Sequence, residues 1–574
     1  MGRRWVVLVA LVLAACAIAI ARAASSSDPN AVGPNTGIQP NGRRLAPPGK
    51  LTPIGNHPGG GALTANSHFL WTLSAGRGKN DIRIVRVQPE VKVTCKKKRV
   101  HGHKVRKCRK VLKGKVGAVV QIIPMPGVDG GIAMAADGRT AYVSGNKDSD
   151  HKDEQVAANV PGKEGDVIHV FHYDRSTGIA QRAGIIPVPP PSGSPTPQNF
   201  PPTNTKKLSW PRDLAVTPNG RTLLAALNLA DRAAIVDTVT KTVQYVQTGS
   251  YPYGAAITRD GKGLVSNESN GTVSVIDLGT GTKIKDIQVG NHLSHPEGIA
   301  VDPKEDRAYV AVASEDKVVE IDTKALAVKH DLLLQRPQGV GTEPTQVSVS
   351  RDGCYLTSAD SGEDAVAVYR LRSGCPPYKK AKKRKRHSSG SVRGKALTSA
   401  AAPHVTTALP EPQLLARVPT AAYPVMASVV QGAKSIAWIS AKGLGVGPNP
   451  NGPNPLSTND SDNNINSFQY LPSIVDGAAG VLPFPTPKQF GQYNAQALAQ
   501  VRPANGEQPP PGTPITAPGP GQKIQHVFYI VRENRTYDQV LGDDPRGNGD
   551  PHLELFPSNL TPNAHALAKR FPLL

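Results

Sequence analysis

The residues best suited to chemistry lie near the end of the chain. The run Ile524–Val531 has the composition of a buried strand, and Glu533, Asn534, Arg535 and Thr536 follow it directly. A carboxylate and an amide therefore lie at the carboxyl end of a predicted strand, where α/β folds position their chemistry. This pattern predicts the start of an α/β domain with a polar site at the strand end.

The first 23 residues have the features of a secretory signal peptide. Their start is basic, the run Trp5–Ile20 is apolar, and the segment 21–23 (ARA) is typical of a cleavage site. Cys16 supports an alternative, in which the protein is a lipoprotein anchored at that cysteine. Both alternatives predict an exported protein, either secreted or held in the cell envelope or periplasm. Residues 24–49 are expected to form a disordered N-terminal segment.

Four cysteines remain after removal of the signal peptide, and an even number in an exported protein favours disulfides. The pairs that lie close in sequence are Cys95 with Cys108 and Cys354 with Cys375. A metal site is the rival interpretation, but the sequence has no cysteine or histidine cluster at zinc spacing. We therefore predict two local disulfides.

The net charge of +23 is concentrated in two segments. Residues 92–115 contain twelve Lys or Arg, residues 376–395 contain nine, and neither segment contains an acidic residue. These segments are either solvated excursions or docking sites for anionic cell-envelope polymers or lipid head groups. Nucleic acid is not favoured as a partner, because no aromatic residues are interleaved for base stacking.

A phrase of about 40 residues recurs between about residues 50 and 480, and its short β-rich runs alternate with polar turns. This period is typical of propeller blades, which bury their faces only by stacking on one another. The clearest copies are AVTPNGRTLLAAL (215–227), AITRDGKGLVSN (256–267), AVDPKEDRAYVAV (300–312) and SVSRDGCYLTSA (348–359). We count seven blades, starting near Gly55, Val128, Trp210, Tyr251, His295, Glu343 and Tyr423.

A residue followed by proline recurs where the first strand of six blades begins. Proline is expected to push the preceding residue into an extended conformation. Side chains from successive blades would then surround the axial channel, although packing between repeats is the simpler alternative. The resulting ligand candidates are His57, Trp210, Tyr251, His295 and Tyr423.

The PNG, RDG and ADG turns and the VID and IVD strand ends resemble those of the YVTN-type seven-bladed β-propeller family. The resemblance implies an all-β propeller over residues 50–500. Both basic segments would enter the turn between the third and fourth strands of a blade, in blades one and six. The Pro- and Gly-rich stretch 501–522 is then a linker, and residues 523–574 begin a second domain.

The run HVFYIVRENRTYDQVLGDD (526–544) and the downstream GNGDP resemble the start of the bacterial phosphoesterase family. That family includes phospholipases C and acid phosphatases of the alkaline phosphatase superfamily. By this resemblance Glu533 and Asn534 are metal ligands, since oxygen donors hold a divalent cation that neutralises a phosphoryl group. Arg535 either pairs with phosphate or supports the loop, and Thr536 either contacts substrate or caps a helix.

The chain departs from that family after Asp544, because the nucleophile and the remaining metal ligands lie further downstream in the family. We therefore expect residues 523–574 to be the truncated start of an α/β alkaline-phosphatase-like domain. If residue 574 is the true end, no phosphatase activity is expected. Two functions remain: metal-dependent hydrolysis of phosphate esters by a complete domain, or non-catalytic binding of envelope components by the propeller. We expect a monomer in both cases.

Overall fold

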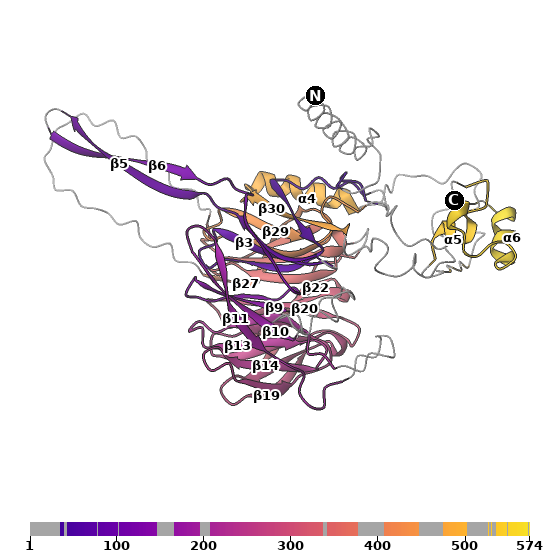
Figure 1. Cartoon of the computed structure of the whole chain (residues 1–574), viewed down its shortest axis with the longest axis horizontal. Helices are drawn as coiled ribbons and strands as arrows, with labels where there is room; N and C mark the ends of the chain where they lie inside the picture. Colours follow the sequence, from indigo (N-terminus) through magenta and orange to yellow (C-terminus); the bar gives the residue numbers. More distant parts are fainter. Residues whose placement is uncertain are drawn as a thin grey trace, which may run out of the picture. The chain divides into compact units, whose positions relative to one another are not determined.

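The computed structural model describes residues 35–39, 43–76, 79–100, 103–145, 166–195, 207–336, 341–376, 407–446, 474–501, 535–547 and 549–571, together with His526, Phe528, Ile530 and Leu573. The chain divides into two compact units, residues 1–448 with 475–501 and residues 449–474 with 502–574. The first unit is a seven-bladed β-propeller of four-stranded antiparallel sheets (Figure 1).

Each blade is an antiparallel meander of four strands. The four strands are consecutive in sequence except in blade one, which has an insertion before its fourth strand, and in blade seven, whose outer strand comes from the N-terminal end of the propeller. Blades one to three contain β2 (Pro58–Leu63), β3 (Phe69–Gly76), β4 (Lys79–Arg86) and β7 (Val119–Pro124); β8 (Ile132–Met134), β9 (Thr140–Gly145), β10 (Val167–Tyr173) and β11 (Ala180–Pro187); and β12 (Pro211–Val216), β13 (Thr222–Leu227), β14 (Arg232–Asp237) and β15 (Val243–Gln247). Blades four and five contain β16 (Pro252–Ile257), β17 (Lys262–Asn267), β18 (Thr272–Asp277) and β19 (Thr282–Gln288); and β20 (Pro296–Val301), β21 (Arg307–Val312), β22 (Lys317–Asp322) and β23 (Ala327–Leu333).

The last two blades complete the ring. Blade six contains β24 (Pro344–Val349), β25 (Tyr355–Asp360), β26 (Ala365–Arg372) and β27 (Ala408–Pro419); blade seven contains β28 (Pro424–Val429), β29 (Ser435–Ser440), β30 (Asp476–Pro483) and β1 (Lys50–Asn56). The first strands of the seven blades contact one another in a closed circle and so form the innermost ring. The predicted seven-bladed propeller is thus confirmed.

The N-terminal strand β1 closes the propeller. It pairs antiparallel with β30, so that Leu51 lies opposite Gly480, and it forms the outer edge of blade seven. Because β1 belongs to blade seven and the next strand along the chain, β2, belongs to blade one, the chain ties the first and last blades together. The sequence interpretation had placed the start of blade one near Gly55 and had not foreseen this closure.

The hydrophobic core lies between neighbouring blades. Trp71 of β3 is fully buried against Phe171 and Tyr173 of β10, with ring centroids 5.8 and 5.7 Å apart. Each blade contributes alternating apolar side chains to both of its interfaces, as the period of two in a strand requires. Because the apolar faces of each blade pack against the neighbouring blades, the hydrophobic core is shared between adjacent blades.

Part of the segment that was expected to be disordered is ordered against blade seven. Ile38 and Leu45 are buried, and Gly37 donates its N–H to the carbonyl of Leu444 over 2.8 Å. Arg43 pairs with the buried carboxylate of Asp364 at 2.5 Å. The expectation failed because these partners lie more than 300 residues away in sequence.

Helix α4 (Pro487–Val501) covers the outside of blades six and seven and was not predicted. Phe490 is buried and packs edge-on against Phe484 at 5.5 Å between centroids. Asn494 accepts the backbone N–H of Arg417 in β27 over 3.1 Å. Among the helices of the described residues, none combines the length and apolar character needed to cross a bilayer.

The first basic segment forms a β-ribbon and not a loop. β5 (Glu90–Val100) and β6 (His103–Lys113) pair only with each other, between the third and fourth strands of blade one (Figure 1). Cys95 lies directly opposite Cys108 in this ribbon, but the side chain of Cys108 is outside the described residues, so that disulfide stays a prediction. The second basic segment follows β26 of blade six and lies almost wholly outside the described residues.

Cys354 and Cys375 are joined by a disulfide, with their Cα atoms 5.6 Å apart. Cys354 precedes β25 and Cys375 follows β26, so the bridge joins the start of the second strand to the end of the third. Antiparallel pairing brings these two points together, and the predicted pairing of Cys354 with Cys375 is observed.

The second unit contains α5 (Tyr537–Leu541), the 3-10 turn η5 (Pro551–Leu553) and α6 (Pro562–Arg570). The strand that was predicted over 524–531 is represented only by His526, Phe528 and Ile530, and none of these three is assigned to a strand. The described residues of this unit therefore give a few helices and do not show an alkaline-phosphatase-like sheet.

Candidate functional site

The propeller axis contains a pocket that is lined by the start of the innermost strands. The pocket has a volume of about 220 Å³. In six blades the first strand is irregular directly after its proline, and such bulges re-aim side chains. All seven blades contribute the equivalent residue to the lining: Gly59, Gly130, Arg212, Tyr253, Glu297, Thr345 and Val425.

The residues before the prolines are left-handed, which corrects the prediction of an extended conformation. Their φ values lie between +40° and +58°, at His57, Trp210, Tyr251, His295, Glu343 and Tyr423. In four of the six, an aspartate from the preceding blade accepts the backbone N–H of the left-handed residue. The local preference set by proline is overcome because this hydrogen bond between blades fixes the turn.

Arg212 is the central charge of the pocket. Its guanidinium pairs with Asp129 at 3.4 Å, donates a hydrogen bond to the Tyr253 hydroxyl and lies 4.2 Å from the centroid of the Tyr253 ring. Trp210 in turn donates its indole N–H to Asp129 over 3.1 Å. Ion pairing, hydrogen bonding and the aromatic face therefore all hold the guanidinium in one position.

Glu297 supplies a second functional group. Burial raises the pKa of its carboxyl to about 8, and the neighbouring Glu268 carboxylate adds to this shift although Arg212 opposes it. Its Oε2 atom is buried and has no hydrogen-bond partner among the described residues. At neutral pH most of the Glu297 carboxyl is therefore protonated and can donate a hydrogen bond within the pocket.

Two other ionisable groups of the lining have different roles. Burial raises the pKa of Asp213 to about 6, but its two oxygens accept the backbone N–H groups of Leu214 and Ala255 at 2.8 and 3.1 Å. Asp213 thus joins blades three and four. Burial also raises the pKa of the Tyr253 hydroxyl, which consequently stays protonated over the physiological range.

The ligand candidates from the sequence divide into three groups. His57 and Tyr423 line the pocket, and Trp210 supports it through Asp129. Tyr251 is 41% exposed and His295 is also exposed, and neither lines the pocket.

Arg212, Tyr253 and Glu297 were missed by the sequence reasoning. The signal that could have found them is the position after the recurrent proline, where these three blades carry polar residues. The aromatic and imidazole residues before the proline are the more conspicuous feature of the repeat, but only His57 and Tyr423 of the predicted set line the pocket.

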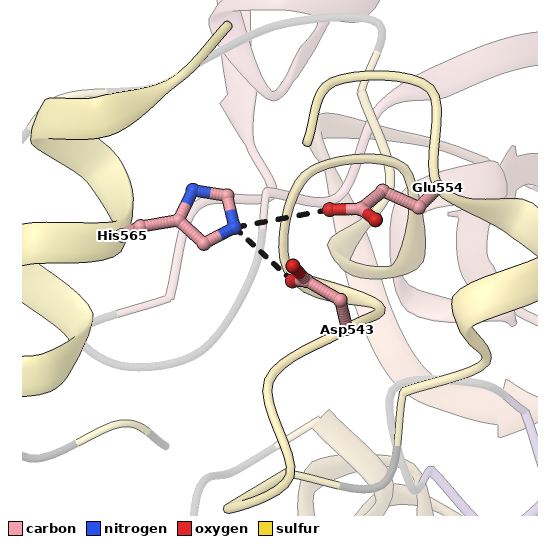
Figure 2. A group of neighbouring side chains, drawn as sticks. All are labelled: Asp543, Glu554 and His565. Atoms are coloured by element: carbon pink, nitrogen blue, oxygen red, sulfur yellow. Dashed lines mark hydrogen bonds and ion pairs between the residues drawn. The ribbon is translucent and has the colours of Figure 1, made fainter. Parts of the chain in front are cut away.

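The second unit brings a different set of side chains together. Asp543, Glu554 and His565 offer ligand atoms that all lie within 4.8 Å of one another (Figure 2). His565 Nε2 is 3.1 Å from Asp543 Oδ1 and 3.8 Å from Glu554 Oε1. No role for these three residues follows from the sequence, because they are separated along the chain and match no ligand motif.

The residues of the predicted phosphoesterase motif are described only in part. Glu533 and Asn534 lie outside the described residues. Thr536 caps α5, since its hydroxyl accepts the N–H of Gln539 and the Gln539 side chain accepts the N–H of Thr536, both at 3.3 Å. The Arg535 guanidinium lies 4.7 Å from the centroid of the Phe556 ring.

Comparison with known proteins supports the propeller. Residues 262–418, which run from β17 to β27, match the family model described as Lactonase, 7-bladed beta-propeller. No curated protein matches the chain in sequence.

Solved structures with a similar fold have low sequence identity. Hydrazine synthase from Kuenenia stuttgartiensis is 17% identical, with 62% of this chain and 87% of that chain covered and a TM-score of 0.34. An inactive variant of virginiamycin B lyase from Staphylococcus aureus, solved with quinupristin, is 12% identical, with 68% and 95% covered and a TM-score of 0.37. A proposed 6-phosphogluconolactonase from Bacteroides uniformis is 13% identical, with 56% and 82% covered and a TM-score of 0.36. At these values the likenesses carry no argument about function.

Proposed function

We propose that the propeller is a binding module that takes a small, oxygen-rich ligand, such as a hydroxy acid or its lactone, in its axial pocket. The observation that carries this proposal is the convergence of Arg212, Tyr253 and Glu297 from three successive blades on one pocket. Binding sites are typically concave, with a few polar groups in fixed positions, and this arrangement meets that description.

The chemistry of the lining favours a ligand that accepts hydrogen bonds. Arg212 and the Tyr253 hydroxyl are donors, and the Glu297 carboxyl is also a donor while it is protonated. Asp129 balances the charge of Arg212, so the pocket suits a ligand with several neutral or singly charged oxygens better than a polyanion. The volume of about 220 Å³ restricts the occupant to a small molecule.

The matched family model suggests lactones as the first probes, because its name refers to lactone hydrolysis. A carboxyl group whose pKa is about 8 can transfer a proton near neutral pH, as general acid–base catalysis requires. Hydrolysis of a bound lactone would then extend binding: water adds to the carbonyl carbon, the bond to the ring oxygen breaks, Glu297 protonates that oxygen, and the proton released by the water returns to the Glu297 carboxylate.

The test is a ligand-observed NMR screen of small carboxylates, lactones, sugars and amines against the full chain. We expect carboxylates and lactones to bind the natural protein and to lose binding in Arg212→Met. Arg259→Met is the matched control, since Arg259 lies in an exposed turn away from the pocket lining. Binding of amines alone, or binding that is unchanged in Arg212→Met, would contradict the proposal.

A second candidate function is metal-dependent hydrolysis of phosphate esters. Its support is the resemblance of residues 526–544 to the phosphoesterase family, with Glu533 and Asn534 as metal ligands. The test is hydrolysis of p-nitrophenyl phosphate with added divalent metals. Turnover that disappears in Glu533→Gln would support this candidate, and an absence of metal-dependent turnover would leave pocket binding as the function of these 574 residues.

The basic ribbon supports a proposal about partners and location. Eleven of the twelve cationic residues of segment 92–115 lie in β5 and β6, an extended two-stranded element whose form suits an anionic envelope polymer or lipid surface. The Cys354–Cys375 disulfide is in keeping with export. Salt-sensitive binding to vesicles with and without anionic lipid tests the partner, and equal binding to both would count against it.

A further inference from the structure

We propose that Asp543, Glu554 and His565 form a binding site for one divalent transition-metal ion, best suited to Zn²⁺, that holds the C-terminal unit together. The three side chains come from the turn after α5, the segment after η5 and the middle of α6, and they converge on one point (Figure 2). This inference is independent of the axial pocket and of the roles suggested for Glu533 and Asn534.

The spacing of the ligand atoms fits a tetrahedral ion. Metal bonds of about 2.1 Å at tetrahedral angles separate neighbouring ligand atoms by roughly 3.4 Å. The observed separations from His565 Nε2, 3.1 Å to Asp543 Oδ1 and 3.8 Å to Glu554 Oε1, lie on either side of that value. The two carboxylate oxygens lie within 4.8 Å of each other, so a modest rearrangement of their side chains would complete three metal bonds and leave a fourth position open.

The His565 ring turns Nε2 toward the two carboxylates, where it lies within hydrogen-bond distance of Asp543 Oδ1 at 3.1 Å, and a divalent ion would replace the proton shared there. Nδ1 lies 3.0 Å from the Thr561 carbonyl oxygen, which only accepts hydrogen bonds, and 2.9 Å from the Thr561 hydroxyl. That hydroxyl donates its own hydrogen to the Phe556 carbonyl over 2.8 Å. Nδ1 must therefore be the donor, and a partner of this kind fixes the ring of a metal-binding histidine.

Glu554 provides the second observation that points to a missing cation. Its Oε1 atom is buried and has no hydrogen-bond partner among the described residues. The charged groups around the Glu554 carboxyl are the Asp543 carboxylate and the His565 ring, whose Nε2 is 3.8 Å from Oε1, so two carboxylates face one imidazole. A buried carboxylate beside another carboxylate needs a counter-charge, and a metal ion or a proton can supply it.

The ligand types select the metal. Imidazole nitrogen together with carboxylate oxygen suits Zn²⁺, whereas Mg²⁺ and Ca²⁺ prefer a set of oxygen ligands alone. Such an ion would also link α6 to the turn after α5 and to the segment after η5, since one ligand comes from each.

The test is isothermal titration of Zn²⁺ into the full chain, which we compare with Glu554→Gln and His565→Gln. The matched control is His526→Asn, which removes an exposed histidine from the same unit. We expect one Zn²⁺ site in the natural protein and in the control, at least tenfold weaker in both cluster variants, with no comparable binding of Mg²⁺. Equal Zn²⁺ affinity in all four proteins would overturn the proposal.

A second measurement keeps the proposal testable if the cluster variants unfold locally. Zn²⁺ alone should slow tryptic cleavage after Lys569 in the natural protein severalfold, as followed by mass spectrometry, because the ion would anchor α6. The same addition should leave cleavage of Glu554→Gln unchanged. Cleavage of the natural protein at the same rate with and without Zn²⁺ would also overturn the proposal.

Discussion

The guanidinium of Arg212 lies 4.2 Å from the ring centroid of Tyr253, and the two residues occupy the same position in neighbouring blades. Each directly follows the proline with which the innermost strand of its blade begins. The repeat therefore generates the contact: one backbone geometry, used in successive blades, points unlike side chains at a common axis. A change of residue at this one repeat position changes the pocket without altering the blade.

Removal of the Arg212 charge should destabilise the propeller as well as weaken ligand binding in the axial pocket. In Arg212→Met the Asp129 carboxylate, whose side chain is only 14% exposed, loses its ion-pair partner. We expect the free energy of unfolding to fall by about 1–3 kcal/mol. Chemical denaturation measures this, and the double variant Arg212→Met/Asp129→Asn should recover part of the loss. Independent, additive effects of the two substitutions would contradict the pairing.

Glu297 should make stability depend on pH. Because burial raises its pKa to about 8 in the folded protein, the native state binds a proton that the unfolded chain releases near pH 4 to 5. The contribution of Glu297 to stability is therefore fully present below about pH 4.5 and is lost as the pH rises toward about 8. Relative to the natural protein, Glu297→Gln should gain about 1–4 kcal/mol between about pH 5 and pH 8.5. A stability difference that does not change over this range would contradict the assignment.

Asp364 should be important for joining blades six and seven. Its Oδ1 accepts the N–H of left-handed Tyr423 over 2.9 Å, and its Oδ2 accepts from Arg43 at 2.5 Å and Gln39 at 2.8 Å. Loss of these buried bonds in Asp364→Ala should cost about 3 kcal/mol of unfolding free energy. Asp364→Asn, which keeps one acceptor, should cost less, and the exposed control Asp306→Ala should stay within about 0.5 kcal/mol. Equal thermal midpoints for Asp364→Ala and Asp306→Ala would refute this role.

The disulfide of blade six should stabilise the folded propeller. Cys354 and Cys375 close a loop with a sequence separation of 21 residues, for which loss of the cross-link typically costs about 2–4 kcal/mol. We expect Cys354→Ser/Cys375→Ser and the reduced natural protein to unfold at similar, lower denaturant concentrations. Detection of both cysteines as free thiols in the natural protein, purified without reductant, would contradict the bridge.

The fold could be predicted from sequence wherever its determinants are local. Turns such as Arg351-Asp352-Gly353 recur with the period of a blade, and the alternation of apolar residues between them specifies strands, so the number of blades followed. Closure by β1 did not follow, because its partner β30 lies more than 400 residues away and Pro53 weakens the strand pattern.

The site was harder to predict for the same physical reason. The left-handed conformation of Tyr251 depends on an aspartate in the preceding blade, Asp231, and not on its own proline. Arg212 and Glu297 become a site only when the blades pack together. Packing buries Glu297, which raises its pKa, and brings Asp129 against Arg212, whose charge it balances. The candidate metal ligands Asp543, Glu554 and His565 likewise come together only after α5 and α6 have packed.

The most direct test of the account is the affinity of the axial pocket for the strongest carboxylate or lactone ligand from the NMR screen, measured by titration calorimetry at about pH 6.5 and pH 9. We predict binding by the natural protein and by Arg259→Met, and at least tenfold weaker binding by Arg212→Met. Affinity should also fall toward pH 9 in the natural protein, since Glu297 then loses the proton it donates. Ligand binding in this pocket would be contradicted if the natural protein and Arg212→Met had the same affinity and if the affinity of the natural protein were the same at pH 6.5 and pH 9.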